Sequence, residues 1–263
     1  MLLLLAACGR TVSTVEDMEY TLFSRALDET GHPIKKELKG RYSGEVIGGV
    51  PNGTGAFTTK NKVGDPWTYT GEFKNGTFHG QGTKEWNTGP EKFYPRITGS
   101  YVDGLYVPTK QEMLYYMERN DTKDNECTLE TKALEWISDH ENLFPCTSQK
   151  DMEETKSTLP RETTCEEMRM DFSAYTESPV LLNELQVVYA SSWDVDGNVI
   201  TTILAMDKNL DTIYIYYLGK CEIEGGNKVS VVGIPVADSY YVGYIDDVPK
   251  TYPAVKLAAC YVE

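Results

Sequence analysis

The sequence lacks several features that would point to a known class of function. It has no apolar run of about 20 residues, the length that crosses a membrane as a helix. It has no G-x-S-x-G, H-E-x-x-H, P-loop or nucleotide-binding fingerprint. Its three histidines are not spaced as a ligand pair, so we expect no metal. We therefore expect neither a catalytic centre nor a cofactor, although a carboxylate-dependent glycosidase needs no local motif.

Basic residues are also few. There are 25 Lys plus Arg against 40 Asp plus Glu, which gives a net charge of -15. A molecule with this charge repels nucleic acid and anionic lipid surfaces. We therefore expect no nucleic-acid partner.

The first eight residues, MLLLLAAC, are apolar and small up to a cysteine. This stretch resembles the lipobox of bacterial lipoproteins, in which a peptidase cuts before a cysteine that becomes diacylated. The resemblance implies a chain that begins at Cys8 and is held by lipid on the outer side of a membrane. The other interpretation is the remnant of an ordinary signal peptide or a chance apolar start, because a basic n-region and a full-length apolar h-region are missing.

One glycine-rich pattern occurs twice at a constant offset of 27 residues. A third copy keeps Gly99 and Gly104 but has Ile97 in place of the first tyrosine, and it ends at Val107, as expected of a terminal cap. The matched positions are Tyr42 and Tyr69, Gly44 and Gly71, Glu45 and Glu72, Gly49 and Gly76, Gly53 and Gly80, and Gly55 and Gly82.

The pattern YxGxxxxGxxxGxG resembles the MORN repeat, in which each unit is an antiparallel hairpin stacked on the next. Asn75-Gly76 and Asn52-Gly53 are dipeptides that favour tight turns, and His79 would lie in the turn region. Glycines within strands indicate close approach of a neighbouring group, here the rings of Tyr42 and Tyr69. We therefore expect a short β-hairpin solenoid over residues 40–107.

The aromatic residues of this region allow two interpretations. They are Trp67, Phe73, Phe78 and Trp86. They either fill the thin interior of the solenoid or form a stacking surface for a sugar or a partner strand. We favour interior packing.

Residues 108–160 differ in character from the repeats. Apolar residues recur at helical spacing around Met113–Met117 and Leu134–Ile137, which predicts two short helices. The stretch 148–162 has no aromatic and few apolar residues, and we interpret it as a linker. Residues 9–39 are treated as an N-terminal segment without a predicted fold.

The last domain, residues 161–263, contains a helix near 165–175 followed by five runs rich in β-branched and aromatic residues. This order resembles the OB-fold domains of secreted bacterial proteins. The resemblance implies a five-stranded barrel in which the third and fifth strands run parallel, and hence a candidate disulfide between Cys221 and Cys260. A weaker candidate joins Cys127 and Cys146, and the remaining alternative leaves all these thiols reduced.

OB barrels bind oligonucleotides or oligosaccharides on one face. Residues 180–263 hold five Lys, no Arg and eleven Asp plus Glu, a net charge of -6 that disfavours nucleic acid. Their tyrosines would either pack within the domain or stack on sugar rings, and we favour packing. The stretch DVDGN has the wrong spacing for a calcium loop and predicts a hairpin turn. The tyrosines considered are Tyr214, Tyr216, Tyr217, Tyr240, Tyr241 and Tyr244.

The sequence thus predicts a mainly β protein with a hairpin solenoid, a small helical segment and an OB-like barrel. The expected function is a membrane-anchored, extracytoplasmic binding or scaffold protein of the bacterial cell surface. The alternatives are a carbohydrate-binding module of the cell envelope and, less favoured, an enzyme that uses carboxylates.

Overall fold

A computed structural model describes residues 11–28, 32–87, 96–121, 128–157, 160–245 and 248–263. The chain divides into two compact units, Met1–Val107 and Pro108–Glu263, called here the repeat unit and the barrel unit. Among the described residues, no helix is both long enough and apolar enough to span a membrane.

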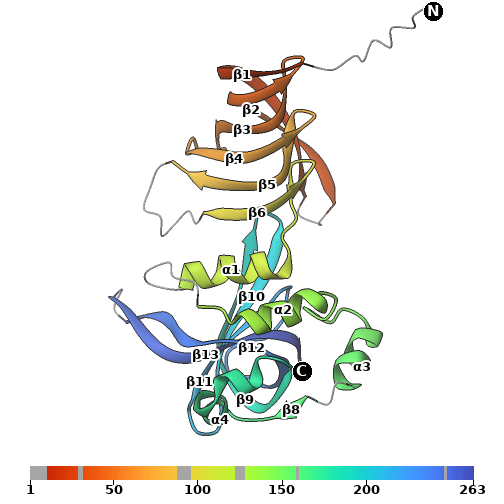
Figure 1. The fold of residues 1–263 in the computed structure, drawn as a ribbon. Coiled ribbons are helices and arrows are strands. Elements are labelled where there is room, and N and C mark those ends of the chain that lie inside the picture. The colour runs from red at the N-terminus through yellow and green to blue at the C-terminus, as the bar shows by residue number, and fades with distance from the viewer. Residues whose placement is uncertain (1–10, 29–31, 88–95, 122–127, 158–159, 246–247) are drawn as a thin grey trace, which may run out of the picture. The chain divides into compact units, whose positions relative to one another are not determined.

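The repeat unit is a curled antiparallel sheet of seven strands in sequence order (Figure 1). It begins well before the region in which the sequence pattern is visible, because residues of the N-terminal segment supply the first strand. The mainly β solenoid predicted for this region is confirmed. The strands are β1 (Val12–Leu27), β2 (Pro33–Ile47), β3 (Val50–Lys60), β4 (Pro66–Lys74), β5 (Thr77–Trp86), β6 (Ile97–Val102) and β7 (Leu105–Tyr106).

Five glycines form one row across this sheet, each directly opposite the next on the neighbouring strand. Their close packing leaves no room for side chains: a Cβ atom built on Gly71 would lie 2.5 Å from both the Cα atom of Gly82 and the carbonyl oxygen of Gln81. Such distances are far inside van der Waals contact. The row is Gly44, Gly55, Gly71, Gly82 and Gly99.

The turns between paired strands use residues with positive φ. Asn75 and Gly76 connect β4 to β5 with φ of 52° and 82°, as predicted. The prediction of a turn at Asn52-Gly53 is wrong: the equivalent turn is Gly48-Gly49, and Gly53 lies within β3. The offset of 27 residues makes Gly48-Gly49, not Asn52-Gly53, the position equivalent to Asn75-Gly76 in the other repeat.

His79 likewise lies in strand β5 rather than in a turn. Gly80, with φ of 58°, follows it where the pairing of β4 with β5 shifts register. A β-bulge therefore takes the place of the predicted turn at this position.

The barrel unit begins with helices. The two predicted ones are confirmed as α1 (Lys110–Asp121) and α2 (Thr131–Asp139). The expected linker is wrong in part, because Gln149–Ser157 form α3. Its N-terminus is capped reciprocally: Asp151 N–H donates to Ser148 Oγ at 3.1 Å, and Ser148 N–H donates to the Asp151 carboxylate at 3.2 Å.

Five strands of this unit close into a ring in the order β9, β10, β11, β13, β12 and back to β9. The predicted parallel pairing of the third and fifth strands is confirmed for β11 and β13. The short strand β8 (Arg161–Glu162) pairs in parallel with the start of β9 and is not part of the ring. The ring strands are β9 (Val180–Val195), β10 (Asn198–Met206), β11 (Thr212–Tyr217), β12 (Lys228–Ile245) and β13 (Val248–Val262).

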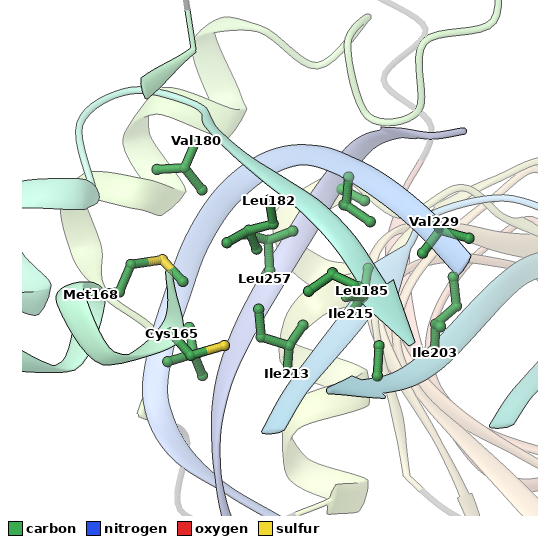
Figure 2. Close-up of a cluster of buried hydrophobic side chains, with 14 of the residues drawn as sticks. Cys165, Met168, Val180, Leu182, Leu185, Ile203, Ile213, Ile215, Val229 and Leu257 are labelled. Carbon is green, nitrogen blue, oxygen red and sulfur yellow. The ribbon is translucent and has the colours of Figure 1, made fainter. Parts of the chain in front are cut away.

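The barrel core consists mainly of aliphatic side chains from alternate positions of the ring strands (Figure 2). Cys165 and Met168 on α4 (Cys165–Met170) pack against this cluster and are fully buried. A 3-10 helix, Phe172–Tyr175, follows α4. The expected helix at 165–175 is therefore present as two short pieces. Labelled members of the cluster include Val180, Leu182, Leu185, Ile203, Ile213, Ile215, Val229 and Leu257.

Candidate binding surface

The outward face of the barrel carries a row of tyrosine rings. Ile213 and Ile215 point into the core, so the alternation of a strand turns Tyr214 of β11 outward. Its ring stacks on Tyr241 of β12, with centroids 5.8 Å apart and planes at 3°. Tyr241 in turn stacks on Tyr252 of β13 at 5.1 Å and 18°.

A fourth ring, Tyr189 of β9, lies on the same face. Strand pairing sets Tyr189 opposite Leu204 of β10, and Leu204 opposite Tyr214. Tyr189 is 40% exposed, whereas Tyr241 and Tyr252 are half-buried. Burial raises the pKa of Tyr241, and the neighbouring hydroxyls of Tyr189 and Tyr252 add to the effect. We call Tyr189, Tyr214, Tyr241 and Tyr252 the tyrosine platform.

Trp193 extends this aromatic face along β9. It is opposite Ile200 of β10 and is 53% exposed. Its indole Nε1–H donates to the hydroxyl of Thr202 at 3.1 Å, which fixes the orientation of the ring. An exposed, oriented indole offers an apolar surface without a further loss of rotamer freedom on binding.

Beside the platform lies a buried ion pair. Lys256 of β13 is opposite Tyr214, and its Nζ donates to Glu118 of α1 at 2.7 Å. Both charged side chains are fully buried. The hydroxyls of Tyr216 and Thr128 also donate to the Glu118 carboxylate, at 3.2 and 3.1 Å. Helix α1 is thereby fixed against this part of the barrel, and the carboxylate is well supplied with donors.

The six tyrosines considered in the sequence analysis differ in how far they are buried. Tyr214 and Tyr216 are buried, which agrees with the packing that the sequence favours. Tyr217 packs against the barrel core, and Tyr240 and Tyr241 are half-buried. The side chain of Tyr244 lies outside the described residues.

Two members of the platform were missed in the sequence. Tyr189 and Tyr252 were not singled out because neither belongs to a run of tyrosines, and both are far along the chain from the run IYIYY at residues 213–217. The alternation of β9 gave a signal for Tyr189, but only the pairing of β12 with β13 brings Tyr252 to Tyr241.

The aromatic rings of the repeat unit are in its interior. Trp67, Phe73 and Phe78 are 3 to 5% exposed, and Trp86 is half-buried. Phe78 stacks on Tyr69 with centroids 4.2 Å apart. Interior packing, the favoured interpretation, is thus confirmed for the first three, which leaves them unavailable for a sugar or a partner strand.

Comparison with protein families gives a match in this region. The family model of the MORN repeat matches residues 42–62 and 69–90. These two segments are MORN repeats. Neither the curated proteins nor the solved structures include a significant match to the chain.

The MORN residues have defined structural roles. The ring of Tyr42 lies over Gly55, where a Cβ atom would be 2.5 Å from the tyrosine hydroxyl, and Tyr69 lies over Gly82 in the same way. The Tyr42 hydroxyl donates to the carbonyl oxygen of Glu45 at 2.7 Å. The MORN pattern is therefore a packing pattern of this unit, in which Gly55 and Gly82 leave space for a ring.

In each of the two MORN repeats, a glutamate side chain accepts a backbone hydrogen bond from the bulge that follows the turn. Glu45 accepts the backbone N–H of Thr54 at 2.6 Å, and Glu72 accepts that of Gln81 at 3.0 Å. The hydrogen bonds from Thr54 lower the pKa of Glu45. These carboxylates are thus held by the backbone of their own repeat.

Four cysteines have free thiols in the structure: Cys146, Cys165, Cys221 and Cys260. The pairing of Cys221 with Cys260 stays a prediction. Cys8 and Cys127 lie outside the described residues. Within the described ranges, no group of three or more His, Cys, Asp or Glu side chains is placed to hold a metal ion.

Proposed function

We propose that the protein is an extracytoplasmic binding protein, held at a membrane by lipid on Cys8, whose contact surface is the tyrosine platform. The observation that carries this proposal is the half-buried stack of Tyr241 on Tyr252, supported by the buried ring of Tyr214 and neighbouring the exposed ring of Tyr189. Aromatic rings offer a large apolar area and a hydroxyl that hydrogen-bonds at its edge, a combination common at binding surfaces.

The ligand class that fits this surface best is a neutral or basic glycan of the cell envelope. Sugar rings present flat C–H faces that stack on aromatic side chains, and the platform presents the exposed ring of Tyr189 and the half-buried rings of Tyr241 and Tyr252. The net charge of -6 over residues 180–263 opposes an anionic ligand such as single-stranded nucleic acid. A protein partner is the other occupant of the same surface.

An OB-like fold of the barrel supports the glycan proposal. The ring order and the parallel pairing of β11 with β13 agree with the OB-like interpretation of the sequence. OB-folds bind oligosaccharides beside their second and third strands, which correspond to β10 and β11 here. Tyr214 lies on β11 and is buried, so this strand supports the platform from beneath.

The proposed anchor sets where the repeat unit would lie. Three residues lie between Cys8 and Val12, the first residue of β1, so four peptide steps join the two. A fully extended chain of this length spans at most about 14 Å. The N-terminal end of β1 would therefore lie close to the membrane surface.

We propose binding rather than catalysis from the roles of adjacent acids. Glu167, beside Glu166, is part of a capping box with Thr164 at the start of α4 and also accepts the hydroxyl of Thr163. Another adjacent pair, Asp246 and Asp247, lies outside the described residues. A carboxylate-dependent enzyme is accordingly the less favoured candidate.

The test is a glycan array and a peptidoglycan pull-down with the full-length protein and the variant Tyr241→Ala. We expect binding to a glycan class and a loss of about tenfold in affinity for the variant, because removing the central ring breaks the stack. Binding to a purified envelope protein without any glycan would favour the second occupant. Equal binding by the wild type and the variant would contradict the assigned surface.

A further inference from the structure

The loop between α2 and α3 brings one thiol beside another on the last strand. Leu143 and Cys146 form an isolated antiparallel bridge within this loop. The backbone N–H of Cys146 donates to the carbonyl oxygen of Cys260 at 2.8 Å. Cys146 and Cys260 are 114 positions apart in the sequence, so nothing in the sequence suggested this proximity.

Standard covalent geometry on either side of this single 2.8 Å contact keeps the two Cα atoms within about 7 Å of each other. Disulfides occur at Cα distances of about 4.4 to 6.8 Å, so the backbone separation is compatible with a disulfide. The Cys146 sulfur now lies 3.2 Å from the hydroxyl of Thr155 and 3.5 Å from the Leu143 carbonyl oxygen. A rotation about χ1 of Cys146 would exchange these weak contacts for a sulfur partner.

The alternative partner of Cys260 is less well placed. Cys221 packs against the barrel core, and its backbone N–H donates to the hydroxyl of Thr201 at 3.0 Å. Burial raises the pKa of Cys260, and the group whose charge adds to this effect is Cys146. The influence of Cys146 on the pKa of Cys260 associates these two residues, whereas the hydrogen bond of Cys221 holds that residue at Thr201.

We propose that Cys146 and Cys260 form a disulfide under oxidising conditions. This bond joins the α2–α3 loop to β13 and so fastens the helical segment to the barrel. Formation of this disulfide in the cell rests on the extracytoplasmic location proposed above, because disulfides persist in oxidising compartments. The geometry itself does not depend on that location.

The chemistry is thiol–disulfide exchange with a small disulfide such as oxidised glutathione. Cys146 is half-buried and Cys260 is fully buried, so the Cys146 thiolate attacks first. Its attack gives a mixed disulfide and releases one glutathione thiolate. The Cys260 thiolate then attacks the Cys146 sulfur and releases the second. Both protein thiol protons pass to the two glutathione molecules, and the protein loses two electrons in total.

Burial raises the pKa of both thiols. The hydrogen bond with Thr155 offsets part of this rise for Cys146, whose pKa remains raised. Few thiolates are therefore present at neutral pH, and the exchange reaction is expected to speed up as pH rises from 7 to 9.

The experiment uses purified full-length protein, first reduced and then equilibrated with oxidised glutathione, followed by peptide mapping without reduction. We expect a linked peptide pair containing Cys146 and Cys260. The oxidised protein should melt roughly 5 °C or more above the reduced protein. Cys146→Ser should remove both the linked pair and the difference in melting temperature.

Cys165→Ser is the matched control, because Cys165 is buried at α4, and it should leave the linked pair intact. Linkage of Cys221 to Cys260, linkage of Cys127 to Cys146, or free thiols at both Cys146 and Cys260 after equilibration would overturn the proposal. Because oxidation is done on purified protein, these outcomes are independent of glycan binding and of membrane anchoring, which test the proposed function.

Discussion

The two units fill their interiors with different kinds of side chain. In the repeat unit, rings such as Tyr42 and Tyr69 lie over glycines of the neighbouring strand, so aromatic area and backbone replace bulky aliphatic packing. In the barrel, aliphatic side chains from five strands form one cluster. The first arrangement leaves a recurring pattern in the sequence, whereas the second leaves only alternation within each strand.

The units also differ in what they present outside. The large aromatic side chains at the centre of the MORN repeats are buried, while Tyr189 and Trp193 of the barrel are exposed on one face. The rings at the centre of the MORN repeats therefore serve packing, whereas Tyr189 and Trp193 of the barrel are available for contact. We take this difference as the reason to place binding on the barrel.

The largest predicted effect concerns a feature present in the barrel, the buried pair of Lys256 and Glu118. Lys256→Met leaves the Glu118 carboxylate buried without its cation, and we expect a loss of about 3 to 5 kcal/mol in the free energy of unfolding. Urea denaturation measures the loss, and hydrogen exchange should assign it to peptides from 108–263.

The control for this prediction is the double variant Lys256→Met with Glu118→Gln. The neutral amide oxygen can still accept the hydroxyl proton of Tyr216, so most of the lost stability should return. A single variant as stable as the wild type would show that the pair does not hold α1 on the barrel.

The second effect concerns the glycine row of the repeat unit. Gly71→Val introduces a branched side chain where even an added Cβ atom would lie 2.5 Å from backbone atoms of the next strand. We expect a loss of about 2 kcal/mol or more through overpacking, measured by urea denaturation.

Gly48→Asn is the matched control for Gly71→Val. Gly48 has φ of 62°, which Asn tolerates, and a Cβ atom there meets no heavy atom within 4 Å. It should change stability by less than about 0.5 kcal/mol. Equal effects of the two substitutions would argue against close packing across the glycine row.

Local signals were sufficient for much of the repeat unit and for the barrel strands. The offset of 27 residues located Gly44, Gly55, Gly71 and Gly82, the third copy of the pattern located Gly99, and alternation located the ring strands. The turn at Gly48-Gly49 was misplaced because Asn52-Gly53 is a stronger turn dipeptide in isolation. The bulge at Gly53 depends on Glu45 of the preceding strand, which a dipeptide rule does not include.

The rest depends on contacts between distant parts of the chain. Helix α3 had a local signal, the Ser148–Asp151 capping box, that its polar composition obscured. The pair of Lys256 with Glu118 and the stack of Tyr241 on Tyr214 had none. Both require the closed ring to be known first, so the candidate site was less predictable than the fold.

A smaller effect, of about 1 kcal/mol, is expected when the hydroxyl of Tyr42 is removed. Tyr42→Phe deletes the donor to the Glu45 carbonyl oxygen but retains the ring over Gly55. Urea denaturation near pH 7 measures this loss. A much larger loss would mean that the hydroxyl, and not the ring, dominates the contribution of this tyrosine.

Alkaline pH tests the same residue. Burial, with the nearby charge of Glu45, raises the pKa of Tyr42 to about 12 in the folded protein, above the ordinary value of 10.0. A raised folded pKa gives a stabilising contribution that is complete below pH 10 and is lost as pH rises toward 12. The stability of the wild type should therefore fall over this range, and that of Tyr42→Phe should fall less steeply. Parallel curves would contradict burial of the Tyr42 hydroxyl.

The most direct test of the account compares glycan affinity in two aromatic variants, one from each unit. Tyr241→Ala removes the centre of the tyrosine platform, and Phe23→Ala removes a repeat-unit ring that is 47% exposed. Calorimetric titration with the glycan class selected on the array should show about tenfold weaker binding for Tyr241→Ala and unchanged binding for Phe23→Ala. Unchanged binding for Tyr241→Ala together with weaker binding for Phe23→Ala would place the contact surface on the repeat unit and contradict the account.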